Sequence, residues 1–129
     1  MKIRGEFDVK MTPLPAEDAA GPMGRFLLDK QYRGDLTGAS RGQMVAFRSA
    51  TDGSAGYVAM EQVTGTLAGR AGTFVLQHSS LMTRGVPTQS ITVVPGSGTG
   101  ELAGLSGSMT IDVVDKKHFY EFAYETANT

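Results

Sequence analysis

The sequence contains no cysteine. This absence excludes disulfide bonds, thiolate nucleophiles, cysteine-based zinc sites and iron–sulfur clusters. It fits a reducing compartment, and we expect a cytoplasmic protein. Long hydrophobic runs are lacking too, because no stretch approaches the ~18 apolar residues of a membrane span. The opening residues, MKIRGEFD, alternate charged with apolar side chains. We therefore expect neither a signal peptide nor an association with membranes.

The chain also lacks an excess of positive charge. It carries 12 Lys and Arg against 13 Asp and Glu, for a formal net charge of −1. Nucleic-acid binding requires a concentrated basic face, so we expect no nucleic-acid partner. The two histidines, His78 and His118, stand in no metal-ligand spacing with each other or with carboxylates. The sequence thus predicts neither a metal site nor a cofactor.

Glycine, by contrast, is abundant: 17 of the 129 residues, nearly twice the usual share of ~7%. Residues 2–11 alternate apolar with charged side chains, which indicates a half-buried strand. Prolines and glycines then predict a break in which residues 16–20 form a loop or one helical turn. Further strands are predicted over residues 23–33, 35–48, 57–67, 73–82, 89–94, 105–114 and 118–125.

Eight short strands without a helical period predict an all-β fold, either a barrel or a sandwich. Glycines inside the predicted strands favour a closed antiparallel barrel, because tight curvature needs positions at which a strand can bend. We expect one domain over residues 1–126 and a short tail over residues 127–129.

The apolar pattern predicts the register of two hairpins. A turn centred on Gly69 and Arg70 would set Glu61 opposite His78. It would also set Val63 opposite Leu76, and Gly65 opposite Phe74. A turn at Ala68 and Gly69 would instead shift the register by two and keep Glu61 and His78 on one face as diagonal neighbours. In the last hairpin, a turn at residues 115–116 sets Met109 opposite Phe122, Ile111 opposite Tyr120 and Gly107 opposite Tyr124.

Two short motifs match known fingerprints but stand in the wrong context. Residues 98–103, GTGELA, fit the dinucleotide pattern G-x-G-x-x-A, yet β-like sequence follows where a helix is needed. Residues 38–42, GASRG, fit the nucleophile elbow around Ser40, but the next residues continue as a strand. Both segments are therefore interpreted as bends that glycine permits.

The remaining candidate site is a small polar cluster. In the register above, Glu61 and His78 face each other on the buried side, and Lys30 is flanked by apolar residues two positions away on either side. Buried charges are rare unless they are paired, so these residues predict a site that orients a ligand or moves a proton. The alternative is that Glu61 and His78 only satisfy each other, while Lys30 extends to the barrel mouth. His118 is expected at the surface.

Two tyrosines, Tyr57 and Tyr120, complete the set of candidate ligand contacts. Tyr120 is expected first of all in the core, together with Phe122 and Tyr124.

Three segments carry a resemblance to a known family: GSAGYVAME (53–61), GRAGTFVLQH (69–78) and PGSGTGELAGL (95–105). The chain resembles short bacterial "domain of unknown function" proteins with an allene oxide cyclase-like barrel. The resemblance spans nearly the whole chain, is most specific over residues 94–111, and implies a barrel without an established activity. More distantly, residues 98–100, GTG, are similar to a segment of the plant allene oxide cyclases and the dirigent proteins. The plant cyclases line their pocket with asparagine and cysteine. This chain has no cysteine and only Asn128, so that mechanism does not carry over.

The leading hypothesis is a barrel that binds a small, partly apolar molecule, with Glu61, His78 and Lys30 fixing its polar end. One alternative is an isomerase or cyclase in which Glu61 and His78 transfer protons. Another is a non-catalytic scaffold whose interior is filled. Predicted strands with apolar residues on both faces, as at residues 44–47 and 57–60, also predict a homo-oligomer. The resemblance to the cyclase-like barrels implies a trimer, and a dimer is the alternative.

Overall fold

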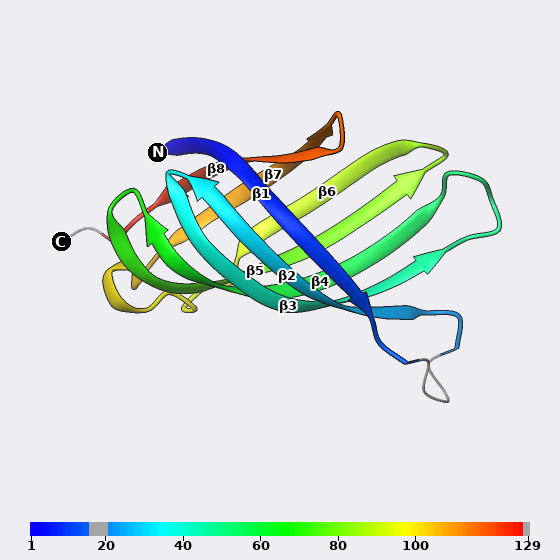
Figure 1. The fold of residues 1–129 in the computed structure, drawn as a ribbon, viewed down its shortest axis with the longest axis horizontal. Coiled ribbons are helices and arrows are strands. Elements are labelled where there is room, and N and C mark those ends of the chain that lie inside the picture. Colours follow the sequence, from blue (N-terminus) through cyan, green and yellow to red (C-terminus); the bar gives the residue numbers. More distant parts are fainter. Residues whose placement is uncertain (16–20, 128–129) are drawn as a thin grey trace.

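The computed structural model describes residues 1–15 and 21–127, and they form a closed barrel of eight antiparallel strands (Figure 1). The strand order around the barrel is the order along the chain. The strands are β1 (Lys2–Pro13), β2 (Gly24–Gly34), β3 (Leu36–Arg48), β4 (Ala55–Leu67), β5 (Arg70–Thr83), β6 (Val86–Val93), β7 (Ser106–Val114) and β8 (Lys117–Glu125). A single 3-10 turn, η1 (Gly100–Leu102), joins β6 to β7.

This architecture confirms the predicted all-β barrel, and every predicted strand is present with its ends within a few residues of the expected ones. The two segments interpreted as bends also agree. Residues 38–42 lie inside β3, and residues 98–103 include η1, which is followed by a strand rather than a helix. The predictions for residues 16–20 and for the end of the tail at 128–129 lie outside the described residues.

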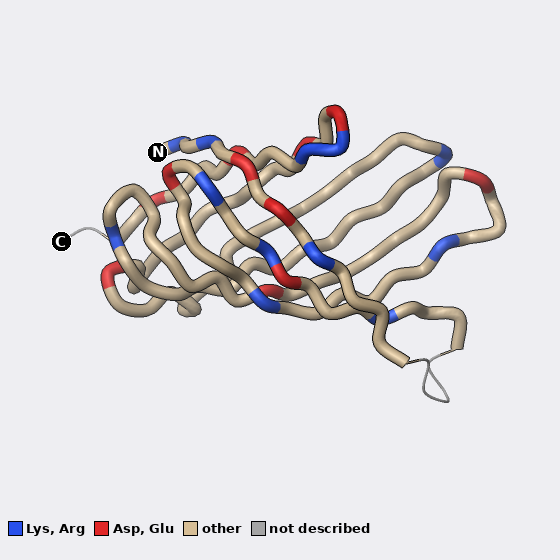
Figure 2. The backbone as a smooth tube through the Cα atoms, viewed as in Figure 1, with Lys and Arg blue, Asp and Glu red and all other residues tan. Residues whose placement is uncertain are grey.

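Charged side chains are spread along the strands rather than gathered on one element (Figure 2). On β1, for example, every second residue from Lys2 to Lys10 is charged, and both signs occur. Within residues 1–15 and 21–127, no helix is long and apolar enough to cross a membrane.

One end of the barrel is closed and tightly packed. The β2–β3 and β4–β5 turns and η1 meet there, and Ala68 N–H donates a hydrogen bond to the main-chain oxygen of Asp35, joining the two turns. Leu102, in η1, and Leu105, shortly after it, pack into the core at this end of the barrel. The side chains that fill this half are buried almost completely: Leu36, Val63, Leu67, Phe74, Leu76, Phe122 and Tyr124.

The opposite end is open. β7 forms only two residue pairs with β6, and β8 pairs with β1 only as far as Phe7 opposite His118. Beyond that level β1 to β6 continue alone as a curved sheet (Figure 1). Inward-facing side chains near this rim are partly exposed, including Met11 at 46%, Met82 at 39% and Val113 at 61%. The inner face of the barrel is therefore partly exposed to solvent at this rim.

The register of the last hairpin is confirmed: Met109 pairs with Phe122, Ile111 with Tyr120, and Gly107 with Tyr124.

The predicted register of the β4–β5 hairpin is wrong by two residues. Glu61 pairs with Leu76, and His78 pairs with Ala59. The turn is centred on Ala68 and Gly69, which both have positive φ angles, of 47° and 87°. Two such residues make a type I′ turn, whose twist matches that of the flanking strands. A shift of two keeps every side chain on its face, so Glu61 and His78 both still point inward, as diagonal neighbours.

Candidate functional site

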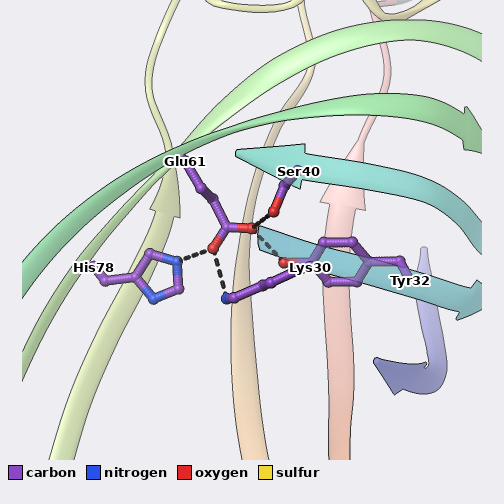
Figure 3. A network of polar contacts seen from close by, with 5 residues as sticks. All are labelled: Lys30, Tyr32, Ser40, Glu61 and His78. Atoms are coloured by element: carbon purple, nitrogen blue, oxygen red, sulfur yellow. Dashed lines mark hydrogen bonds and ion pairs between the residues drawn. The ribbon is translucent and has the colours of Figure 1, made fainter. Parts of the chain in front are cut away.

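Five polar side chains meet in the middle of the barrel around the carboxylate of Glu61 (Figure 3). Lys30 and Tyr32 come from β2, Ser40 from β3, Glu61 from β4 and His78 from β5. Alternate residues of a strand share a face, so Lys30 and Tyr32 project inward together. The network thus joins four consecutive strands across the barrel interior.

The Glu61 carboxylate accepts four hydrogen bonds, two on each oxygen. Oε1 accepts from the hydroxyls of Tyr32, at 2.5 Å, and Ser40, at 2.7 Å. Oε2 accepts from Lys30 Nζ at 2.7 Å and is 2.5 Å from Nε2 of His78. All four acceptor positions of an ionised carboxylate are therefore filled.

The space for this carboxylate depends on a glycine of the neighbouring strand. Gly42 lies opposite Glu61, and a β-carbon at Gly42 would collide with the main-chain oxygen of Met60 and with Cβ of Glu61. The glycine that the sequence pattern marks as a bend therefore allows β3 and β4 to approach closely beside the network.

Glu61 is ionised despite its burial, with only 1% of its surface exposed. Burial alone would raise the pKa of the carboxyl group. The hydrogen bond from His78 and the positive charge of Lys30 outweigh burial and lower the pKa from 4.5 to about 2. Burial and the adjacent Glu61 carboxylate raise the pKa of Tyr32 well above its ordinary value, so this phenol stays protonated and donates. An ionised carboxylate only accepts hydrogen bonds, and Nε2 of His78 must therefore carry a hydrogen.

Lys30 is buried alongside its partner and is only 6% exposed. Besides the ion pair, its ammonium group lies 4.8 Å from the ring centre of Phe7, within the range of a cation–π contact. Breaking such a pair from one side would leave a buried charge uncompensated, which costs about 3–5 kcal/mol.

His78 occupies the side of the network nearest the open end. Its strand partner is Ala59, which lies two residues nearer the rim than Glu61 on β4. The second ring nitrogen, Nδ1, is turned away from Glu61 (Figure 3). Within the described residues no hydrogen bond reaches Nδ1, and no fully buried side-chain nitrogen or oxygen lacks a partner. Nδ1 is therefore not completely buried.

The structure brings together three of the five candidate residues, namely Glu61, His78 and Lys30. Tyr57 faces inward but lies nearer the rim, where it is half-buried and pairs with Ala46 and Ser80. Tyr120 is also outside the network. Its hydroxyl donates to the main-chain oxygen of Arg33, at 2.9 Å, and accepts from Leu36 N–H, at 3.1 Å. Tyr120 thus belongs to the closed end.

His118, which the sequence predicts at the surface, is half-buried instead. Its ring packs against that of Phe7, with the ring centres 5.1 Å apart.

Sequence reasoning missed Tyr32 and Ser40. Tyr32 looked like an apolar flank of Lys30, although its position two residues away places it on the same face. Ser40 was considered only as part of a bend. Within the described part of the chain, no three His, Cys, Asp or Glu residues are grouped as a metal would require.

Comparison with known proteins places the chain in a family. The family model described as "Protein of unknown function (DUF3224)" matches residues 3–124. A crystal structure of a protein of unknown function from the DUF3224 family of Shewanella oneidensis MR-1 is 47% identical, with a TM-score of 0.93. The match covers 100% of this chain and 98% of that one. No curated protein matched. The chain belongs to the DUF3224 family, which has the eight-stranded barrel described above.

Proposed function

We propose that the protein binds a small, partly apolar molecule in the open half of the barrel, with the Glu61 network as the polar floor of the site. The single observation that carries this proposal is the contrast between the two halves. Inward-facing side chains are buried almost completely at the closed end and are partly exposed at the rim. Small-molecule sites are concave and mostly apolar, with a few convergent polar groups, and this half has that composition.

The wall of the proposed site is apolar. Phe26, Met44 and Tyr57 face inward and are half-buried, and Met11 and Met82 lie nearer the rim. Methionine side chains are flexible and polarisable, so they adapt to ligands of different shape. The floor, in contrast, is held rigidly by four hydrogen bonds to one carboxylate. A ligand would thus be oriented by its polar end and held by apolar contacts.

The proposal can be tested with the neutral apolar dye Nile red and two matched variants. Ala46→Phe adds a large side chain to the inner face of β3, opposite Tyr57, whereas Val45→Phe adds the same side chain to the outer face. We expect the dye to bind the wild type and Val45→Phe equally, and Ala46→Phe at least tenfold more weakly. Thermal unfolding of the three proteins would confirm that both variants fold. Equal binding by the two variants, or none by the wild type, would overturn the proposal.

Proton transfer is a second candidate function, favoured by the arrangement of Glu61 and His78. A carboxylate that holds one imidazole nitrogen and leaves the other free is typical of a general base. Turnover of a bound molecule that is abolished by Glu61→Gln, with binding retained, would distinguish an isomerase from a binding protein. If no apolar probe binds, the remaining hypothesis is a non-catalytic scaffold whose interior is filled by side chains.

We also propose that the protein is cytoplasmic, which its lack of cysteine fits.

A further part of the proposal is that the protein self-associates through the outer face of β3 and β4. Val45, Phe47, Val58 and Met60 form an exposed apolar patch on that face. They line or adjoin a shallow groove of about 560 Å³. Apolar patches of this kind on soluble proteins commonly mark interfaces. No nucleic-acid or membrane partner is part of the proposal.

A further inference from the structure

We propose that the bound molecule carries a carboxylate at the end that reaches the floor of the site. This inference rests on the proposed function, because it assigns the chemical class of the same ligand. It follows from the charges and unused hydrogen-bond donors around Glu61.

The buried network has one acidic group and two basic ones. Among the buried charged residues of the described chain, Glu61 is the only acid, and Lys30 and His78 are the two bases. Both bases contact the same oxygen, Oε2 of Glu61. Lys30 and Glu61 balance each other, and no second buried acid of the described residues lies beside the two bases. A carboxylate supplied by a ligand would add a second acceptor beside these two side chains, which now share one oxygen.

Lys30 and His78 both have hydrogen-bonding capacity that the described residues do not use. The Lys30 ammonium has three hydrogens, and the described residues accept only one of them, at Glu61. Nδ1 of His78 points away from Glu61 (Figure 3), and no hydrogen bond reaches it within the described residues. Lys30 and His78 converge on one carboxylate oxygen, so a second carboxylate beside them could accept from both.

Other head groups fit this floor less well. A cationic head would meet Lys30 and His78, the two bases of the network, while the only buried acid is already fully hydrogen-bonded. A neutral hydroxyl could accept a hydrogen bond from Lys30, but that bond is weaker than the ion pair that a carboxylate would form. The six residues from Glu61 back to Ala55 span about 20 Å of strand, which is the length of inner face that the tail would follow.

The experiment compares three probes that share one tail: decanoate, decanol and decylamine. Each would displace Nile red from the wild-type protein, and its affinity would be taken from the displacement curve. We expect decanoate to bind at least tenfold more tightly than decanol, and decylamine most weakly. Decanol binding as tightly as decanoate would overturn the carboxylate assignment and leave the proposed function standing. Failure of every probe and of the dye would overturn both.

Two variants locate the effect at the floor. His78→Gln retains an N–H that can donate to Glu61 but removes the second nitrogen, and Lys30→Met removes the ammonium with a side chain of similar length. We expect His78→Gln to keep its affinity for decanol and lose most of its preference for decanoate. Lys30→Met should behave similarly if it folds, which thermal unfolding would establish. An unchanged preference in His78→Gln would overturn the assignment, whatever the outcome for Lys30→Met.

Discussion

Glu61 is the residue on which the interior of the barrel depends. Its carboxylate is the acceptor for every other polar side chain of the network, and it compensates the buried charge of Lys30. A carboxylate in an apolar interior is ordinarily unfavourable, and four donors make it favourable here. The same atoms therefore stabilise the fold and form the floor of the proposed site.

The ionisation of Glu61 predicts a pH dependence of stability. Its pKa is lowered from 4.5 to about 2 in the folded protein, because the hydrogen bond from His78 and the charge of Lys30 outweigh its burial. The stability that this group contributes is then fully present above pH 4.5 and is lost as the pH falls toward 2. The lowered pKa corresponds to roughly 3 kcal/mol at neutral pH.

Urea unfolding of wild type and Glu61→Gln at several pH values would measure this contribution. We expect the variant to be less stable by a few kcal/mol at pH 7, and the difference to shrink between about pH 4.5 and pH 2. Glu121→Gln is the matched control, since Glu121 pairs with Lys2 and Arg4 on the outer surface. It should cost much less stability than Glu61→Gln, because exposed ion pairs contribute little. A Glu61→Gln effect that is small and independent of pH would contradict the account.

Among the elements, the β4–β5 hairpin brings Glu61 and His78 together. Its turn places Ala68 in the left-handed region, at a φ of 47°, where a residue with a β-carbon is strained. Asparagine followed by glycine is the preferred pair for this turn. We therefore expect Ala68→Asn to raise the free energy of unfolding by about 0.5–1 kcal/mol. Gly69→Ala should lower it. Thermal unfolding would check both, and a destabilised Ala68→Asn would argue against a type I′ turn.

The alternation of apolar and polar residues predicted which side chains of each strand face inward, but it did not determine the pairing of β4 with β5. A turn at Gly69–Arg70 and one at Ala68–Gly69 differ by two residues, so both bury the same face. The turn at Ala68–Gly69 was harder to predict, because it requires a positive φ angle at an alanine, which is strained. What favours it includes a contact that local sequence cannot reveal, the hydrogen bond from Ala68 to Asp35 in the neighbouring turn.

The whole molecule was predictable as a barrel, because strand lengths, turns and glycines are all visible along the chain. The difference between its two ends was not. It depends on where β7 and β8 stop pairing with β6 and β1, which is a property of strands far apart in sequence. Tyr120 shows what the sequence could not predict. The alternation of apolar and polar residues placed its side chain correctly on the inner face, but only the fold shows that its hydroxyl hydrogen-bonds to main-chain oxygens at the closed end.

Self-association is the prediction that belongs to the outer surface. Val58 and Val45 lie directly opposite each other on the exposed face of β4 and β3. Val58→Lys would put a charge in the centre of that patch without touching the interior. We expect light scattering at micromolar concentration to give a dimer or trimer mass for the wild type and a smaller mass for the variant. A monomeric wild type would rule out the proposed interface.

The central claim is that a ligand enters the open half of the barrel, and the methionines test it most directly. Met11, Met44 and Met82 are on the inner face of this half, whereas Met60 is exposed on the outer face. The measurement is the NMR spectrum of the methionine methyl groups during titration with decanoate, with signals assigned by single substitutions. The account predicts that the three inner signals shift together and that the Met60 signal stays in place. A shift of Met60 alone, or of none of them, would contradict it.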